Sequence, residues 1–200
     1  MVDDATALPH DAVLLAGGRA SRLGGVDKTA LVTGGTTLFD HALAAADGAT
    51  HVVVVGLRHG RAAPDHVIRA REDPPFAGPV AALDAGLGAL PGSAPFTLVL
   101  ACDLVRPQQA AAALLAAPER HAPHDGLIAV DQAGRRQPLL ALYRTAALRD
   151  ALDRLRATSG TLEDLSMRRL LAALDLVEVV LPSVLCADID SAEDADRLLD

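Results

Sequence analysis

The 200-residue chain has few aromatic residues, one lysine, two cysteines and no excess of positive charge. Only four side chains are aromatic, and the formal net charge is -8. Four scattered aromatics provide no base-stacking platform for nucleic acid, and an acidic chain is poorly suited to binding phosphate backbones. We therefore expect a small-molecule ligand and no nucleic-acid partner.

Long hydrophobic runs and clustered cysteines are also missing. No apolar run approaches the ~20 residues needed to span a bilayer, and residues 1–10 have neither the basic nor the apolar region of a signal peptide. We expect a cytoplasmic protein without a membrane partner. Cys102 and Cys186 lack CxxC spacing. This spacing disfavours a disulfide framework or a zinc site and predicts two buried free thiols.

The remaining pattern is that of an α/β protein. Half of the residues are apolar, and short Val/Leu-rich runs alternate with longer Ala/Leu-rich segments of helical spacing. This alternation predicts a three-layer sandwich with a Rossmann-like, mostly parallel sheet and helices on both faces. We expect residues 1–200 to form a single domain, with residues 1–10 as a loose tail. The expected strands are Ala12–Ala16, His51–Leu57, His66–Ala70, Phe96–Cys102, Leu127–Val130, Leu139–Tyr143 and Val177–Leu181, and the expected helices are Thr37–Ala46, Val80–Ala89, Pro107–Ala117, Ala146–Arg156, Leu162–Leu174 and Ala192–Leu199.

The first expected strand leads into the glycine-rich segment LAGGRASRLGGVDK, residues 15–28. Open α/β sheets bind ligands beyond the carboxyl ends of their strands, and Gly17 and Gly18 would let backbone N–H groups approach an anion there. The spacing is not that of a Walker A motif, because Asp27 separates glycine from Lys28, and it lacks GxGxxG. The segment therefore predicts a phosphate-binding loop of another kind, the alternative being a flexible surface loop.

Lys28 is the only lysine in a chain with seventeen arginines. An ammonium group is a compact point charge on a flexible stem, whereas a guanidinium group is a rigid planar fork. Arg19 and Arg22 lie in the same segment, so three cations are available to one anion. We predict that Lys28 contacts a phosphate and that Arg22 assists it.

Asp103 ends the most apolar of the expected strands, TLVLACD, at the same sheet edge as the glycine-rich segment. Magnesium binds one or two carboxylates together with substrate phosphates and water, so Asp103 is a candidate ligand. The alternative is an aspartate that only turns the strand into a loop. Asp188 and Asp190 would share one face of an extended segment, which makes Asp190 a candidate second ligand unless it belongs to the turn before Ser191.

Several segments, in order along nearly the whole chain, resemble the molybdenum cofactor guanylyltransferases, the MobA-like nucleotidyltransferases with a Rossmann-like fold. The resemblance implies Mg²⁺-dependent transfer of GMP from GTP to the terminal phosphate of molybdopterin, with release of pyrophosphate. It also suggests contacts with other cofactor-biosynthesis or acceptor proteins. The similar segments are LAGGRASRLGGVDK, ALVTGGTTLFDHAL, REDPPFAGPVAAL, LACDL, QPLLALYR and DIDSAEDADRL.

The same resemblance implies a set of site residues. Because the acceptor phosphate can attack the α-phosphorus directly, positioning and charge stabilisation are sufficient and no protein nucleophile is needed. Asp73 matches an acidic position of the family's nucleotide site, although it is also an ordinary polar residue before a proline-containing loop. The implied catalytic residues are Arg22, Lys28 and Asp103; the implied nucleotide-binding residues are Leu15, Ala16, Gly17, Gly18, Lys28, Asp73 and Asp103; the implied metal ligands are Asp103 and Asp190.

Two positions leave the substrates open. Val55 stands where MobA-like enzymes tend to carry an asparagine, which removes a polar contact to base or ribose. Gln137 and Pro138 stand where the family often has His-Pro near the acceptor. The alternatives are a sister nucleotidyltransferase, either a molybdopterin cytidylyltransferase or one acting on a sugar or polyol phosphate, and a noncatalytic nucleotide-binding protein.

Overall fold

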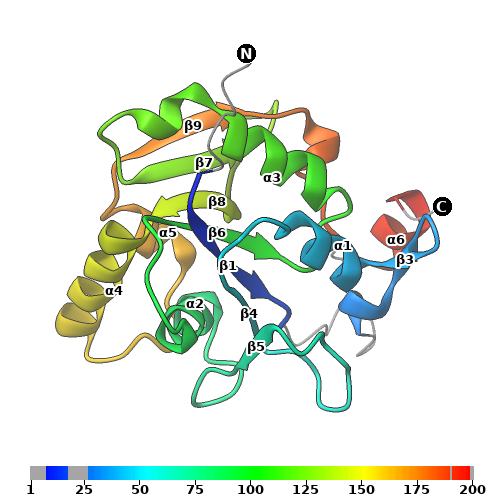
Figure 1. Ribbon diagram of the computed structural model, residues 1–200, viewed down its shortest axis with the longest axis horizontal. Coiled ribbons are helices and arrows are strands. Elements are labelled where there is room, and N and C mark those ends of the chain that lie inside the picture. Colours follow the sequence, from blue (N-terminus) through cyan, green and yellow to red (C-terminus); the bar gives the residue numbers. More distant parts are fainter. Residues whose placement is uncertain (1–7, 18–26, 190, 199–200) are drawn as a thin grey trace.

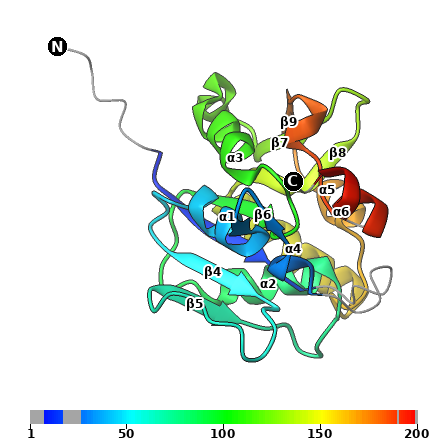
Figure 2. The same cartoon turned by 90° about the vertical axis from the view of Figure 1, so that its right-hand side faces the viewer.

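The computed structural model describes residues 8–17, 27–189 and 191–198. Its centre is a seven-stranded sheet of order β5-β4-β1-β6-β8-β7-β9, with helices on both faces (Figures 1 and 2). β8 is antiparallel to both of its neighbours, and the other pairs are parallel. The mostly parallel α/β sandwich is thus confirmed. The strands are β1 His10–Leu15, β4 Val52–Val55, β5 Val67–Ala70, β6 Phe96–Ala101, β7 Gly126–Val130, β8 Arg136–Arg144 and β9 Leu176–Val180.

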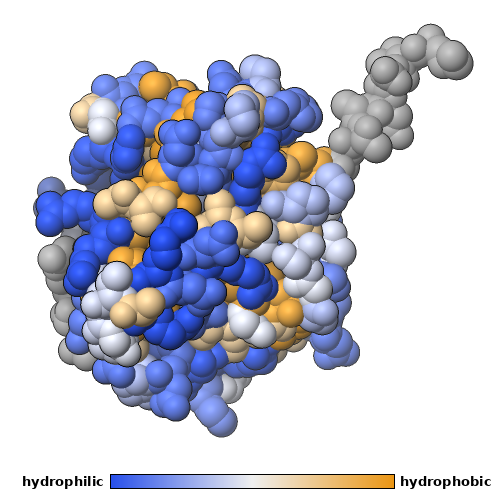
Figure 3. Space-filling view, turned by 90° about the vertical axis from the view of Figure 1, so that its left-hand side faces the viewer, coloured by the Kyte–Doolittle hydropathy of each residue, from blue (hydrophilic) through white to orange (hydrophobic). Residues whose placement is uncertain are grey.

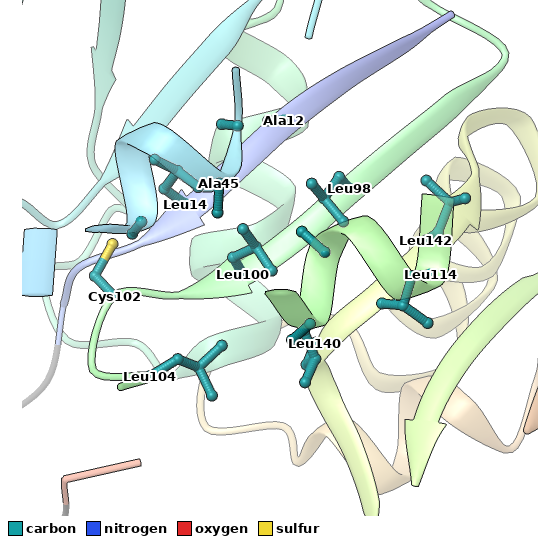
Figure 4. Close-up of a cluster of buried hydrophobic side chains, with 14 of the residues drawn as sticks. Ala12, Leu14, Ala45, Leu98, Leu100, Cys102, Leu104, Leu114, Leu140 and Leu142 are labelled. Atoms are coloured by element: carbon teal, nitrogen blue, oxygen red, sulfur yellow. The ribbon is translucent and has the colours of Figure 1, made fainter. Parts of the chain in front are cut away.

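Alternating side chains of each strand build two cores, one on each face of the sheet. Ala12 and Leu14 of β1 join the cluster under α1 and α3, which Figure 4 shows in part. Val13 and Leu15 join the cluster under α2, α4 and α5 on the opposite face. The sheet is therefore covered from both sides, and its strand ends are left for a ligand. The helices are α1 Leu38–Ala45, α2 Pro79–Ala89, α3 Pro107–Ala116, α4 Thr145–Ser159, α5 Met167–Leu171 and α6 Ala192–Leu198.

Short elements connect the glycine-rich segment to the first helix. Two-residue strands β2 (Val32–Thr33) and β3 (Thr36–Thr37) pair antiparallel, and the two glycines between them both have positive φ, as a two-residue hairpin turn requires. The Thr37 hydroxyl then accepts a hydrogen bond from the Asp40 N–H and caps α1. Three 3₁₀ turns complete the described elements: η2 Lys28–Ala30, η3 Pro118–His121 and η4 Ser183–Leu185.

The expected loose tail is too long. β1 begins at His10, which is buried, and its ring Nδ1 lies 2.7 Å from the Leu8 carbonyl oxygen. Leu8 packs against the core beneath α1 and α3. Residues 8–10 are therefore part of the folded body, because Leu8 contributes to the core and His10 pairs beside Phe96 of β6.

The helix expected over residues 162–174 is much shorter. Only Met167–Leu171 is helical, and Asp164 has φ +54, in the left-handed region that interrupts a right-handed helix. Leu162 and Leu165 are nevertheless buried with α2 and α4. Leu162 and Leu165 are three positions apart, as on one face of a helix, because both pack into the core. The backbone between them is not helical.

Charged residues give the outer side of α4 its polarity. The helix buries Leu148, Ala151, Leu152 and Leu155 against the sheet. On the side of α4, Figure 3 shows hydrophilic residues intermixed with hydrophobic ones.

In the part of the chain that the structure describes, no helix combines the length and the apolar character needed to cross a membrane.

Candidate active site

A cavity of about 530 Å³ opens where β1 and β6 end, at the carboxyl edge of the sheet. Leu15 and Gly17 from the end of β1 line it, together with Asp103 just after β6. The first turn of α2 and the segment from Gln137 to Leu140 of β8 form opposite parts of the wall. The cavity therefore lies where an open α/β sheet is expected to bind its ligand.

Lys28 and Asp103 meet at this edge although 75 positions separate them in the sequence. Lys28 Nζ lies 3.2 Å from Asp103 Oδ2, and the two side chains are 19% and 24% exposed. The pair is thus partly withdrawn from solvent. Charges interact more strongly in such a partly buried position than they do in water. The cation and the carboxylate predicted from the sequence form one ion pair at the cavity.

Local structure fixes the position of Lys28. The Asp27 carboxylate accepts hydrogen bonds from the backbone N–H of Thr29, at 3.1 Å, and from its hydroxyl, at 2.6 Å. Asp27 thereby caps η2, and the buried Thr29 anchors the turn to the body of the protein. The aspartate that separates Lys28 from the preceding glycines therefore sets the start of the turn that presents the ammonium group.

The chain near its carboxyl end brings a second carboxylate to the cavity. The Ile189 N–H donates to the Asp103 carbonyl at 3.1 Å, and the Val105 N–H donates to the Ala187 carbonyl at 3.0 Å. These bonds hold the segment 187–189 beside the end of β6, so Asp188 lines the same cavity as Asp103. Asp103 and Asp188 therefore line one ligand space, together with Glu72 and Asp164.

This donor set fits magnesium better than zinc. Among the described residues there is no group of three or more His, Cys, Asp and Glu side chains able to hold a metal ion. Magnesium does not require such a cage, since it takes one or two carboxylates and completes its octahedron with phosphate oxygens and water. Asp103 and Asp188 supply hard oxygen atoms of the kind that it prefers.

The other predicted site residues divide into three groups. Leu15 and Gly17 line the cavity with Asp103, whereas Ala16 lies outside its described lining and donates its N–H to the Val55 carbonyl. Asp73 is exposed and lines a separate cavity of about 260 Å³ with Asp84 and Arg156. The predicted residues that lie outside the described part of the chain are Gly18, Arg22 and Asp190.

Sequence reasoning missed Glu72 and Phe76, which line the main cavity where Asp73 was expected. Glu72 is 7% exposed. Glu72 and Asp73 are adjacent acidic residues, so the sequence alone does not distinguish them. The path of the backbone decides which side chain points into the main cavity. The available signal for Phe76 was its rarity, since it is one of four aromatics and lies in a proline-containing loop.

The structure places Val55 in the core. Its side chain is fully buried in the core under α2. A Cβ atom on Gly86 of that helix would approach a Val55 methyl carbon to 2.9 Å, so the two elements are in close contact. The Val55 side chain therefore packs between β4 and α2.

Tyr143 supports the wall formed by β8. Its ring is fully buried, and its hydroxyl donates to the Pro138 carbonyl at 2.9 Å. The register between β7 and β8 shifts at Ile128/Ala129, opposite this region. Gln137 and Pro138, which line the cavity, are thus held by a bond from the core.

Gly56, directly after β4, lies against Gly17 of the glycine-rich segment. A Cβ atom on Gly56, which has φ +75, would lie 2.7 Å from the Gly17 Cα. Because that displacement would move the Gly17 amide, we expect Gly56→Ala to weaken nucleotide binding by at least about tenfold. Gly60→Ala is the matched control, since Gly60 also has positive φ but an added Cβ would meet no described atom within 4 Å. Calorimetric affinities that fall equally in both variants would contradict this role of Gly56.

The two thiols are confirmed as free and buried. Burial raises the pKa of Cys102 far above its usual range, with the neighbouring Asp103 charge acting in the same direction, and burial also raises the pKa of Cys186. The reactive thiolate form is therefore suppressed in both residues. We expect negligible reaction with a thiol reagent in native protein at neutral pH, and reaction of both thiols after denaturation. Rapid native labelling of Cys102 would contradict this expectation.

The fold and the cavity together define an α/β protein with a ligand site at its strand ends, where a cation pairs with a carboxylate. Residues 12–179 match the family model of the MobA-like NTP transferase domain. A molybdenum cofactor guanylyltransferase from Acidiphilium cryptum (strain JF-5) is 38% identical over 153 residues, which cover 72% of this chain and 70% of that protein. The chain belongs to the MobA-like NTP transferase family and is a nucleotidyltransferase.

Solved structures share the fold at low sequence identity. Rv0371c from Mycobacterium tuberculosis H37Rv has a TM-score of 0.73 and 21% identity, covering 97% of this chain and 99% of its own. Molybdopterin-guanine dinucleotide biosynthesis protein A from Archaeoglobus fulgidus has a TM-score of 0.66 and 20% identity, covering 94% and 96%. The 2-C-methyl-D-erythritol 4-phosphate cytidylyltransferase from Thermus thermophilus also reaches 0.66, with 21% identity, covering 94% and 97%. At these identities the likeness concerns the fold alone.

Proposed function

We propose that this protein transfers GMP from GTP to the terminal phosphate of molybdopterin, with magnesium as cofactor and pyrophosphate as the second product. The observation that carries the proposal is the pair of Lys28 and Asp103 at the cavity beside Gly17. The name of the Acidiphilium relative supports the choice of guanine and of the acceptor.

Lys28 neutralises the triphosphate in this proposal, together with the N–H groups of Gly17 and Gly18 and the guanidinium of Arg22. Attack on the α-phosphorus gathers negative charge on the nonbridging oxygens and on the departing pyrophosphate. A positioned ammonium group lowers the energy of that charge without having to reorganise during the reaction. The ion pair with Asp103 holds the Lys28 ammonium group beside the cavity before the nucleotide binds.

Asp103 and Asp188 hold the magnesium ion in this proposal, and Asp190 remains a further candidate ligand from the sequence. When bound, the ion neutralises phosphate oxygens and orients the triphosphate. With the ion bound, Asp103 would serve as one of its ligands and Lys28 would be available to the phosphates. The acceptor phosphate acts as the nucleophile, because direct attack on the α-phosphorus requires no nucleophile from the protein.

The test is a reaction of purified protein with GTP, Mg²⁺ and molybdopterin, and a parallel reaction with CTP. We expect pyrophosphate release and a guanine dinucleotide product identified by mass spectrometry, with both lost in Asp103→Asn. Product from CTP alone would replace the proposal with a cytidylyltransferase. The absence of product with either nucleotide and this acceptor would refute it.

A further inference from the structure

Phe76 differs from the other aromatic residues of the chain in its exposure. Phe39, Phe96 and Tyr143 are buried, whereas Phe76 is 46% exposed and lines the main cavity. An exposed aromatic ring at a cavity wall gains from being covered by a planar ligand, because both flat faces then leave water. The exposed Phe76 ring therefore favours a planar part of a substrate at this wall of the cavity.

The backbone at Phe76 is held in an unfavourable conformation. Phe76 has φ +66 and Asp164 has φ +54, and they are the two non-glycine residues with positive φ in the described part of the chain. Both line the main cavity. Bulky side chains rarely adopt this conformation, and such strain persists where the surrounding structure enforces it, often at ligand-binding positions.

Two hydrogen bonds enforce the conformation of the loop. The Phe76 N–H donates to Glu72 Oε1 at 2.9 Å, and the Asp164 N–H donates to the Ala77 carbonyl at 2.7 Å. Burying a carboxylate is unfavourable unless hydrogen bonds compensate, yet the other Glu72 oxygen finds no partner among the described residues. Retaining the buried Glu72 thus serves the placement of the Phe76 backbone.

The cavity wall combines charged and apolar residues. Asp103, which pairs with Lys28, lines it together with Glu72 and Asp164, while Phe76, Pro79 and Leu139 supply apolar wall. The Arg71 guanidinium lies 5.8 Å from the centroid of the Phe76 ring, a cation–π contact that restrains the ring. A ligand with an anionic end and a flat ring end matches this arrangement.

We propose that Phe76 is a stacking platform for a fused 2-amino-4-oxo-pyrimidine ring and that Glu72 is the positioning residue that holds it. This inference rests on the proposed function, because the guanine of GTP and the pterin of molybdopterin share that ring. Stacking on an aromatic face contributes to affinity for any such heterocycle. The platform adds a ring-binding contact to a site otherwise defined by its phosphate and metal ligands.

The chain contains no tryptophan, so Phe76→Trp places a single fluorophore at the proposed platform. We would titrate this variant with GTP, with neopterin as a phosphate-free pterin, and with tripolyphosphate, each in Mg²⁺. Val180→Trp is the control, because Val180 is 67% exposed on β9 and outside the described cavities. We expect GTP or neopterin to quench the fluorescence of Phe76→Trp saturably, tripolyphosphate to change it little, and none of the three to quench Val180→Trp.

The result identifies the ring and separates the two proposals. Quenching by GTP assigns the platform to guanine, and quenching by neopterin alone assigns it to the pterin. If calorimetry detects binding of both ligands and neither quenches the fluorophore, the platform is overturned. If neither GTP nor tripolyphosphate binds, the proposed function fails, and the neopterin titration alone decides whether the platform exists.

Affinities of three further variants test the role of each residue. Phe76→Leu keeps apolar bulk without an aromatic face, so we expect about tenfold weaker binding of the stacked ligand and unchanged tripolyphosphate affinity. Glu72→Ala should reproduce this split, and Glu72→Gln should restore binding because its amide oxygen can still accept the Phe76 N–H. Equal loss of tripolyphosphate affinity would indicate general damage to the cavity, and unchanged GTP and neopterin affinities in Phe76→Leu would overturn the inference.

Discussion

Asp103→Asn is expected to lower magnesium-dependent turnover by about a thousandfold. An amide lacks the charge that binds magnesium and leaves the Lys28 ammonium facing a neutral group. The two paired side chains are 19% and 24% exposed, so loss of the ion pair should lower the free energy of unfolding by about 1–3 kcal/mol. The variant should still fold, and the main effect should fall on the reaction.

Steady-state kinetics over a range of Mg²⁺ concentrations measure this effect. Asp65→Asn is the control, because it makes the same chemical change at an exposed position outside the described cavities. Its turnover should equal that of the unmodified protein. Normal turnover of Asp103→Asn at low Mg²⁺ would contradict the assignment of Asp103 as a metal ligand.

Lys28→Arg should reduce turnover by about a hundredfold although the positive charge is kept. Lys28 sits at the start of a capped turn with its ammonium group 3.2 Å from Asp103. A planar guanidinium is larger and directs its hydrogen bonds in a fixed fork, so it cannot follow the oxygens of the α-phosphate as a point charge does. The geometry of the cation, as well as its sign, should therefore limit the rate.

Two further variants serve as controls for the Lys28→Arg prediction. Lys28→Met removes the charge and sets the scale of the full loss, and Arg154→Lys exchanges the same two residue types on the outer side of α4. We expect Lys28→Arg to resemble Lys28→Met in single-turnover rate and Arg154→Lys to resemble the unmodified protein. Unaltered activity of Lys28→Arg would remove Lys28 from the catalytic role.

Much of the fold could be predicted because its strands are continuous apolar runs. The run that became β6 is buried on both faces, so its hydrophobic character alone marked it as a strand. The expected helix over residues 162–174 failed for the opposite reason. Leu162 and Leu165 keep helical spacing for packing, while the left-handed backbone of Asp164 between them has no counterpart in that spacing.

The site was predictable where strand ends determine it and unpredictable where a loop does. Asp103 was predicted to lie at the same sheet edge as the glycine-rich segment, and the parallel pairing of β1 with β6 brings the ends of these two strands together. Glu72 and Asp73 differ by one position, and the turn to Phe76 decides which of them enters the cavity.

Titration calorimetry with GTP, and separately with CTP, in Mg²⁺ tests the central claim most directly. A tenfold difference in affinity corresponds to about 1.4 kcal/mol and is readily measured. The guanylyltransferase assignment predicts that GTP binds at least about tenfold more tightly than CTP, with binding lost in Lys28→Met. Tighter binding of CTP, or binding of neither nucleotide, would contradict it.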